Sequence, residues 1–332
     1  MTVLRVSDLD VRFATDRGWV TVVDGVSFSV AAGATLGLVG ESGSGKTVTS
    51  LAMLGLLPPR TSRIASGSIQ LDGTELIGMP QRRLADIRGN DIAMIFQEPM
   101  SSLNPAFTIG DQIAETVRRH RRVSRRIATA RAVAALDQVG IPNAARRARS
   151  YPHEFSGGMR QRAMIAMAIC CEPKVLVADE PTTALDVTIQ AQVLDLLRQM
   201  RDELRMGMVF ITHDLGVVAD ICDRVVVMYA GQVVATDDVD HLFSHPPHPY
   251  AEGLLAAMPQ AAVPELGGSD RLATIPGQAP PPGAMPDGCR FHPRCPYATD
   301  RCAADAVELR KIDQLRTTRC VRSDELQLRG PA

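Results

Sequence analysis

The stretch Gly40-Glu41-Ser42-Gly43-Ser44-Gly45-Lys46-Thr47 matches the phosphate-binding loop pattern G-x-x-x-x-G-K-[ST] at every fixed position. Its glycines let the backbone approach a polyphosphate closely, and its successive N–H groups can point at the anion. Lys46 is predicted to reach the terminal phosphates, and the hydroxyl of Thr47 can hold Mg²⁺. The stretch therefore predicts a nucleotide-binding chain.

The residues around the loop have the order that such a loop requires. Residues 35–39 are a short apolar run typical of a buried strand, and residues 48–57 are predicted to form a helix that ends before two prolines. Ahead of the loop, residues 4–13 and 20–30 alternate apolar and polar side chains, which predicts half-buried antiparallel strands.

An aromatic residue of these early strands is a candidate for binding the adenine ring. Phe13 or Trp19 can stack on a purine, because an aromatic face gives non-directional affinity for any base. Both side chains could equally serve only to pack the strands, and this alternative stays open.

Length, charge and cysteine content exclude several classes of protein. The 332 residues suffice for one large α/β domain and a smaller appendage. The formal charge of −1 argues against a nucleic-acid surface. The first residues lack a charged region followed by an apolar core, and no apolar run approaches the roughly 18 residues that span a bilayer. We expect a cytoplasmic chain whose seven cysteines do not form a disulfide framework.

Polar residues follow three further strand-like runs, where open α/β sheets place their ligand contacts. After residues 92–96, Gln97 can sense the γ-phosphate, Mg²⁺ or the attacking water. The buried run before Asp179 and Glu180 predicts a carboxylate that orients Mg²⁺ through its hydration shell and one that polarises water for in-line attack. His213 follows residues 208–212 and can bond the γ-phosphate.

A second anion-binding device lies between these strands. Residues 108–150 have a helical, arginine-rich pattern, which predicts a solvated helix face more readily than a DNA-binding one. Phe155-Ser156-Gly157-Gly158-Met159 then precedes a small apolar helix predicted at residues 163–171. A serine hydroxyl and unhindered glycine amides at the positive end of a helix favour phosphate.

In this order, the motifs resemble those of ATP-binding cassette (ABC) ATPases over about residues 3–250. The matching elements are the phosphate loop, the Q-loop at Gln97, the signature at 155–159, the acidic strand at 175–180, the D-loop at 184–186 and the H-loop at His213. The resemblance implies an α/β P-loop NTPase fold over residues 1–258, with an antiparallel β subdomain and an α-helical subdomain at about 100–165.

The resemblance also implies roles for the site residues, with ATP and Mg²⁺ as cofactors. Two subunits are expected to pair head to tail, so that Ser156 and Gly158 of one close over ATP held by Lys46 of the other. Glu180 resembles the catalytic base, and Asp179 and Thr47 resemble the Mg²⁺ ligands. Gln97 and His213 are expected to contact the water and the γ-phosphate, and Gln97 to contact Mg²⁺ as well.

The end of the chain narrows the resemblance. His245-Pro-Pro-His-Pro-Tyr250 is similar to the segment that follows the cassette in oligopeptide- and dipeptide-type importer ATPases. Residues 259–288 are rich in proline and glycine, which predicts an extended linker over the cassette. Residues 289–332 form a small cysteine-rich C-terminal region with Cys289, Cys295, Cys302 and Cys320.

Four clustered cysteines in a reducing compartment favour a metal site over disulfides. Their spacings, five, six and seventeen intervening residues, are not those of a zinc ribbon. The resemblance associates this pattern with a four-iron four-sulfur (4Fe–4S) cluster, while zinc and free thiols stay open as alternatives. Cys170, Cys171 and Cys222 lie in apolar segments and are interpreted as packing residues.

The resemblance implies a peripheral subunit on the cytoplasmic face of the membrane that hydrolyses ATP to power import of short peptides. Its expected partners are two integral membrane permease subunits and an extracytoplasmic peptide-binding protein. Nickel, glutathione or sugar-oligomer cargo stays open. A ribosome- or DNA-associated ABC ATPase is the competing class, but the chain has one cassette and no long coiled coil. A scaffold without turnover is disfavoured by Glu180 and His213.

One residue departs from the common signature. Met159 stands where a glutamine usually follows Ser-Gly-Gly, which removes hydrogen-bonding capacity near a shared nucleotide site. In the peptide-importer subfamily, such chains resemble one member of a pair. We therefore predict a heterodimer with a second homologous ABC ATPase, with a homodimer as the alternative.

Overall fold

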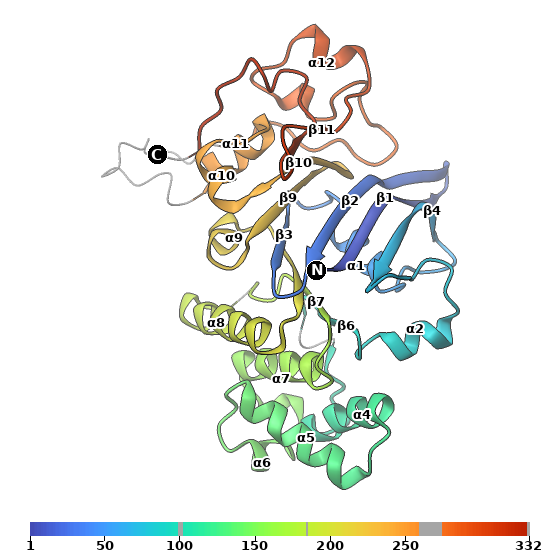
Figure 1. Cartoon of the computed structure of the whole chain (residues 1–332), viewed down its shortest axis with the longest axis vertical. Coiled ribbons are helices and arrows are strands. Elements are labelled where there is room, and N and C mark those ends of the chain that lie inside the picture. Colours follow the sequence, from blue (N-terminus) through green and yellow to red (C-terminus); the bar gives the residue numbers. More distant parts are fainter. Residues whose placement is uncertain (99–101, 184, 259–273, 331–332) are drawn as a thin grey trace. The chain divides into compact units, whose positions relative to one another are not determined.

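The structure, a computed structural model, describes residues 1–98, 102–183, 185–258 and 274–330. The chain, which Figure 1 draws in colours that follow the sequence, divides into two compact units. The first unit joins Met1–Leu4, Val30–Ala34 and Leu71–Phe210, and the second joins Arg5–Ser29, Thr35–Gln70 and Ile211–Ala332. Both units are therefore assembled from stretches that lie far apart in the sequence.

The first unit combines short strands with a group of helices. Its strands are β5 (Thr74–Glu75), β6 (Ile92–Ile95) and β7 (Val175–Asp179). Its helices are α2 (Gln81–Ile87), α4 (Ile109–Arg121), α5 (Arg125–Gln138), α6 (Ala144–Arg147), the 3₁₀ helix η1 (Pro152–Glu154), α7 (Gly157–Ile169) and α8 (Val187–Leu204). Strand β8 (Gly207–Thr212) begins in this unit and ends in the second.

Strands β6 and β7 are parallel neighbours, with Ile92 opposite Val175 and Ile95 opposite Ala178. Every residue of β7 is buried. A strand covered on both faces needs apolar side chains at every position, which explains the unbroken apolar run in the sequence. Polar side chains therefore appear only where β7 ends, at Asp179 and the residue after it.

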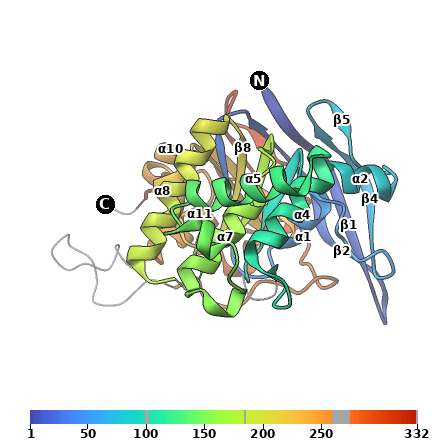
Figure 2. The ribbon, with the colours of Figure 1, turned by 90° about the horizontal axis from the view of Figure 1, so that it is seen from below.

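The helices predicted at residues 108–150 are present as α4, α5 and α6. Figures 1 and 2 show α4, α5 and α7 side by side. The hydroxyls of Thr108 and Ser124 each accept a hydrogen bond from the N–H group three residues later, which starts α4 and α5. Ile109, Ile113 and Val117 share one face of α4 and are fully buried.

The second unit holds two groups of strands and the C-terminal region. Its strands include most of β1 (Thr2–Thr15) and β2 (Gly18–Ala31), together with β3 (Thr35–Val39), β4 (Ser62–Leu71), β9 (Arg224–Tyr229), β10 (Gln232–Asp238), β11 (Arg310–Lys311) and β12 (Thr317–Thr318). Its helices are α1 (Lys46–Met53), α9 (Leu215–Ile221), α10 (Val239–Ser244), α11 (Pro249–Ala256), the 3₁₀ helix η4 (His292–Arg294) and α12 (Asp300–Ala304).

These strands have the orders β2-β1-β4 and β11-β12-β10-β9-β3. The two strands predicted at residues 4–13 and 20–30 are present as β1 and β2, each longer than predicted. Strand β3 pairs in parallel with β9, and β9 pairs antiparallel with β10. The loop after β3 therefore lies beside the turn that joins β9 to β10, where the amide of Gly231 donates to the carbonyl of Ser44 at 3.1 Å.

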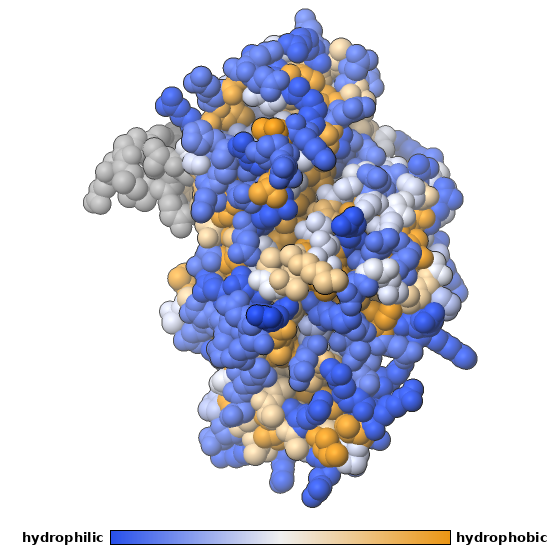
Figure 3. Space-filling model, in the orientation of Figure 1, coloured by the Kyte–Doolittle hydropathy of each residue, from blue (hydrophilic) through white to orange (hydrophobic). Residues whose placement is uncertain are grey.

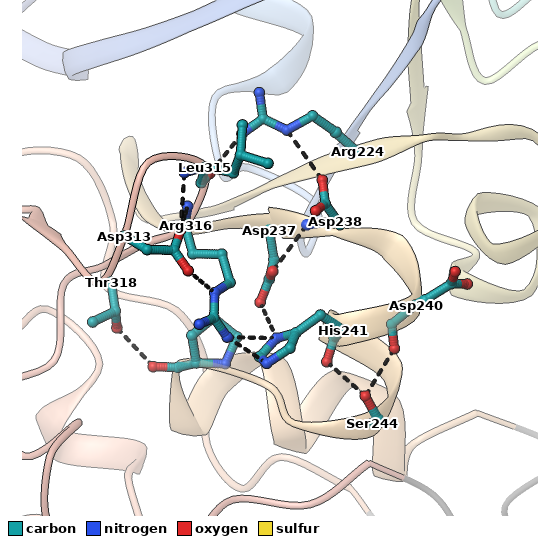
Figure 4. A network of polar contacts seen from close by, with 11 residues as sticks. Arg224, Asp237, Asp238, Asp240, His241, Ser244, Asp313, Leu315, Arg316 and Thr318 are labelled. Carbon is teal, nitrogen blue, oxygen red and sulfur yellow. Dashed lines mark hydrogen bonds and ion pairs between the residues drawn. The ribbon is translucent and has the colours of Figure 1, made fainter.

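The C-terminal region is attached along β10. Strand β12 pairs antiparallel with it, with Ala235 opposite Thr318. The buried carboxylate of Asp237 accepts a hydrogen bond from Nδ1 of His241 at 2.8 Å (Figure 4). The guanidinium of Arg316 contacts the same imidazole ring. This network fixes the segment before β12 to the start of α10.

Residues 274–288, the described part of the predicted linker, contain neither helix nor strand, as their composition indicates. Residues 259–273 of that linker and residues 331–332 lie outside the described residues. The face drawn in Figure 3 is mainly hydrophilic, with apolar residues in small separate spots. In the ranges that the structure covers, no helix is long and apolar enough to cross a membrane.

Two helices begin earlier than the sequence pattern predicts. Helix α1 runs from Lys46 to Met53, not over residues 48–57, and α7 begins at Gly157, not at residue 163. In both cases the helix starts inside the motif. The physical reason is that the first-turn N–H groups, which lack partners within a helix, are themselves the anion-binding groups.

Candidate functional site

The phosphate loop joins the carboxyl end of β3 to the amino end of α1 in the second unit. Gly40 has a φ of 150°, and a Cβ at this position would lie 2.1 Å from the carbonyl oxygen of Met228 in β9. No side chain fits at that distance, so the approach of the loop to β9 requires glycine. The glycine backbone therefore lets the loop lie directly against β9.

Lys46 folds back over the loop that precedes it. Its Nζ donates to the carbonyls of Gly40 at 2.6 Å and Glu41 at 2.9 Å, and lies 3.4 Å from Oγ of Ser44. The side chain is 7% exposed. An ammonium held by neutral carbonyls can exchange them for phosphate oxygens, which are charged and stronger acceptors. Thr47, which follows, is exposed.

A cavity of about 820 Å³ lies between the β1–β2 hairpin and the linker. Trp19, Thr21 and Arg290 line it, together with residues 281–285 of the linker. Thr21 precedes Val22, whose carbonyl oxygen lies 3.3 Å from the position a Cβ on Gly45 would take. This cavity is large enough for a base and ribose.

The two aromatic candidates for stacking on adenine differ in their position. Trp19 lines the cavity, and the guanidinium of Arg63 lies 4.3 Å from its ring centroid. Phe13 is not among the residues that line the cavity in the described part of the chain. The stacking role of either residue stays a prediction.

Gln97 and Glu180 meet in the first unit. They follow the parallel neighbours β6 and β7, so both leave the sheet at the same edge. Gln97 Nε2 donates to Glu180 Oε2 at 2.8 Å, and Thr183 Oγ1 donates to the same oxygen at 3.0 Å. The carboxylate is thus oriented by two neutral donors. Asp179, one residue earlier, is 4% exposed.

Glu180 also has an unusual backbone conformation. Its φ of 47° lies in the left-handed region, which costs a residue with a side chain on the order of 1 kcal/mol. The chain turns sharply here, and the amide of Thr183 donates back to the carbonyl of Glu180 at 3.3 Å. Backbone strain of this kind persists where the surrounding structure holds the residue in place, as it does at functional sites.

The signature motif forms the start of α7. Ser156 is the N-cap, and its Oγ accepts a hydrogen bond from the amide of Met159 at 3.3 Å. Ser156 and Gly157 are exposed. Farther along the helix, the buried side chain of Gln161 donates to the carbonyl of Pro181, the residue after Glu180. The signature helix and the turn after β7 are therefore directly bonded.

The remaining motif residues lie at helix starts. His213 directly follows β8, and the carboxylate of Asp214 caps α9 by accepting from the amide of Gly216 at 2.8 Å. In the D-loop, Asp186 caps α8 by accepting from the amide of Ile189 at 2.9 Å. Ala184 of the same motif lies outside the described residues.

The four cysteines of the C-terminal region converge. Cys289, Cys295, Cys302 and Cys320 all line one cavity. Its volume is about 10 Å³, close to that of one water-sized sphere. Burial raises the pKa of Cys289 and Cys320, and raises the pKa of Cys295 to about 11. These three thiols are therefore protonated at neutral pH and must release protons to bind a metal.

A 4Fe–4S cluster takes one thiolate per iron, and four converging cysteines provide that set. At about 10 Å³, the cavity as it stands is too small to contain a cluster. Across the described ranges, no group of three or more His, Cys, Asp or Glu residues is arranged to hold a metal ion. The cluster and the zinc alternative therefore both stay predictions.

The other three cysteines were interpreted as packing residues. Cys171 and Cys222 are buried, whereas Cys170 is partly exposed. The Sγ atoms of Cys170 and Cys171 lie 4.0 Å apart.

Two residues near the site were not assigned from the sequence. Arg294 lies one residue before Cys295, and its guanidinium binds the carboxylate of Glu41 in the phosphate loop. A buried arginine cannot be told from an exposed one by sequence alone, since arginine is mostly exposed. Thr183 lies three residues after Glu180, at the end of the Pro181-Thr182-Thr183 turn. In the sequence, only this closeness to Glu180 could have indicated its contact with the carboxylate.

Two family models match the chain. Residues 23–183 match the family described as ABC transporter, and residues 234–302 match the family described as oligopeptide/dipeptide transporter, C-terminal region. A relative from Brucella abortus named "Putative peptide import ATP-binding protein" is 54% identical over 300 residues, which are 90% of this chain and 89% of the relative. One of the same description from Brucella melitensis is 50% identical over 98% of both chains.

Solved structures of cassettes are similar in fold. The dimeric ATP-binding cassette MJ0796 in a post-hydrolysis state bound to ADP and Pi has a TM-score of 0.63 at 24% identity, over 71% of this chain and 98% of that one. The cbiO1 protein of Clostridium perfringens, part of the ABC transporter complex cbiONQ, has a TM-score of 0.62 at 25% identity, over 73% and 90%.

Proposed function

The chain belongs to the ABC transporter ATPases, and from this premise we propose that it hydrolyses ATP to power import of short peptides through separate permease subunits. The observation that carries the proposal is the phosphate loop, where Lys46 is held over the backbone between β3 and α1. The match of residues 234–302 to the peptide-transporter C-terminal region supports the cargo class.

The roles of the site residues follow from this proposal. Lys46 and the loop amides bind the phosphates, and Thr47 with Asp179 holds Mg²⁺. Glu180 is the general base for the attacking water, supported by the two hydrogen bonds that orient its carboxylate. Gln97 and His213 contact the water, the Mg²⁺ shell and the γ-phosphate.

The catalytic assignment is tested by Glu180→Gln in the assembled transporter. This change keeps the size of the side chain but removes the basic carboxylate, so MgATP should still bind while hydrolysis falls by about 10²-fold or more. Glu203→Gln is the matched control, because Glu203 is an exposed residue of α8. Near-normal turnover by Glu180→Gln, with the control also unchanged, would refute the assignment.

The peptide cargo is supported by the relatives, which carry the name of peptide import proteins. An importer of this class has two permease subunits and an extracytoplasmic binding protein, so we place the chain on the cytoplasmic face of the membrane. Proteoliposomes with these partners should hydrolyse ATP faster when peptide is present. Stimulation by nickel or glutathione, with none by di- or oligopeptides, would replace peptide as the cargo.

The quaternary structure is proposed from the signature. Ser156 and Gly157 are exposed at the start of α7, as an element that contacts a second subunit must be. Ser156 and Gly158 would close over ATP bound to the partner's phosphate loop. Met159 supports pairing with a second, non-identical ABC ATPase, because the two shared sites then need not be equal.

The domain boundaries follow the same proposal. The ATPase domain is placed at residues 1–258, with its helical subdomain at about 100–165. The linker is placed at residues 259–288 and the cysteine-rich region at residues 289–332.

A 4Fe–4S cluster held by the four cysteines is proposed as a structural group, since a small tail with few apolar residues gains little stability from burial alone. The convergence of the four thiols on one cavity supports this proposal.

A further inference from the structure

Glu41, the second residue of the phosphate loop, is held through each of its polar groups. Its amide donates to Oη of Tyr250 at 2.8 Å, and its carbonyl accepts from Nζ of Lys46 at 2.9 Å. Its carboxylate receives Nη1 and Nη2 of Arg294 at 2.7 and 3.0 Å. Two of these partners lie 209 and 253 positions later in the sequence. The conformation of the loop therefore depends on the C-terminal part of the chain.

Arg294 is itself rigidly held. Its side chain is 6% exposed, and its Nε donates to the carbonyl of Pro276 at 2.8 Å. The guanidinium lies 5.7 Å from the ring centroid of Tyr229 and 6.0 Å from that of Phe291. The hydrogen bonds to Glu41 raise the pKa of Arg294 above its ordinary value. A planar fork fixed in this way imposes both position and orientation on the carboxylate.

The support behind Arg294 is an aromatic cluster. Tyr229, Tyr250 and Phe291 are at most 2% exposed, and their ring centroids lie 4.6 to 5.3 Å apart. They come from β9, α11 and the residue before η4. Tyr250 belongs to this cluster, and Arg294 lies against its rings. The cluster therefore supports both residues that bind Glu41 from outside the loop.

The charge of Glu41 makes this grip relevant to nucleotide binding. The carboxylate is 29% exposed and belongs to a loop that receives a polyphosphate. Without a counter-charge, it would repel the incoming phosphates in a region of lowered dielectric. Arg294 neutralises this charge through two hydrogen bonds and leaves the loop backbone as the net attractive surface.

We propose that Arg294 is a positioning residue of the ATP site, which holds Glu41 and thereby the phosphate loop in the conformation that binds nucleotide. The inference rests on the proposed ATP-binding role of that loop. It adds that the cysteine-rich region is a working part of the nucleotide site, because Arg294 directly precedes Cys295 in the chain. Arg294 takes no part in the chemical step, which is assigned to Glu180 with Gln97 and His213.

The test is binding of a fluorescent ATP analogue with Mg²⁺ to the full-length chain, with circular dichroism to check the fold. Arg294→Gln should weaken binding roughly 10- to 100-fold, the range for loss of hydrogen bonds to a charged group. Arg294→Lys keeps the charge but loses the fork and should fall between. Arg301→Gln is the matched control, because Arg301 is 66% exposed and pairs with Glu325 on the surface of the same region. It should bind as the native chain does.

The double variant Arg294→Gln/Glu41→Gln separates positioning from a general structural role. Removing the uncompensated carboxylate should recover much of the affinity lost in Arg294→Gln, whereas a purely structural arginine predicts no recovery. Native affinity in Arg294→Gln, or a double variant no better than the single one, overturns the inference. If Arg294→Gln does not fold, native affinity in Arg294→Lys overturns the role of the fork. A native chain that binds no ATP instead refutes the proposed function itself.

Discussion

Tyr250→Phe should loosen the phosphate loop while leaving the aromatic cluster in place. The change removes one oxygen, which accepts the amide hydrogen of Glu41 at 2.8 Å. The ring is fully buried and stays in contact with Tyr229 and Phe291, so little packing is lost. Burial raises the pKa of Tyr250, so the hydroxyl is neutral over the whole physiological range.

The expected cost follows from the group left behind. A buried amide without an acceptor lowers the stability of the fold by about 1 to 3 kcal/mol. The lower half of that range applies here because Glu41 is only part-buried. The apparent free energy of unfolding should therefore fall by about 1 to 2 kcal/mol. If the loop conformation that binds nucleotide is destabilised by the same amount, MgATP affinity drops by about 5- to 30-fold, at about 1.4 kcal/mol per tenfold.

Urea unfolding and titration with a fluorescent ATP analogue measure the two effects. Tyr151→Phe is the control, because Tyr151 is 40% exposed and should change stability by less than about 0.5 kcal/mol. If Tyr250→Phe also stays within about 0.5 kcal/mol of the native chain and binds MgATP equally well, the hydrogen bond to Glu41 does not hold the loop.

Three further predictions concern the tail, the partner and a buried carboxylate. Anaerobically purified protein should be brown and lose colour in Cys302→Ser; stoichiometric zinc without visible absorbance would remove the cluster. The chain purified alone should be monomeric and weakly active, and gain ATPase activity with a co-expressed second ABC ATPase; a fully active homodimer that drives transport contradicts this. Burial raises the pKa of Asp237, so folding favours its protonated form, and that stability is lost as pH rises through the raised value. Relative to the native chain, Asp237→Asn should gain free energy of unfolding from about pH 4 to pH 7, and a constant difference in urea unfolding would refute the burial argument.

The predictions that the structure confirmed rest on local patterns. The unbroken apolar run of β7 predicted a strand buried on both faces, and the alternation in residues 4–13 and 20–30 predicted β1 and β2. Helix boundaries were less accurate at α1 and α7. Their first turns lie inside glycine-containing motifs, where helix propensity is low and the backbone conformation is decided by the surrounding structure.

The sequence by itself determined the motifs, their order and the chemistry that each can perform, because a phosphate loop or an acidic strand end is encoded within a few neighbouring residues. Only the tertiary structure decided which residues meet. Gln97 reaches Glu180, and Arg294 reaches Glu41, across 83 and 253 positions. Such contacts depend on how strands pair and on which polar side chains become buried. Neither property leaves a periodic trace in the sequence, so a buried arginine that grips the phosphate loop is visible only once the chain is folded.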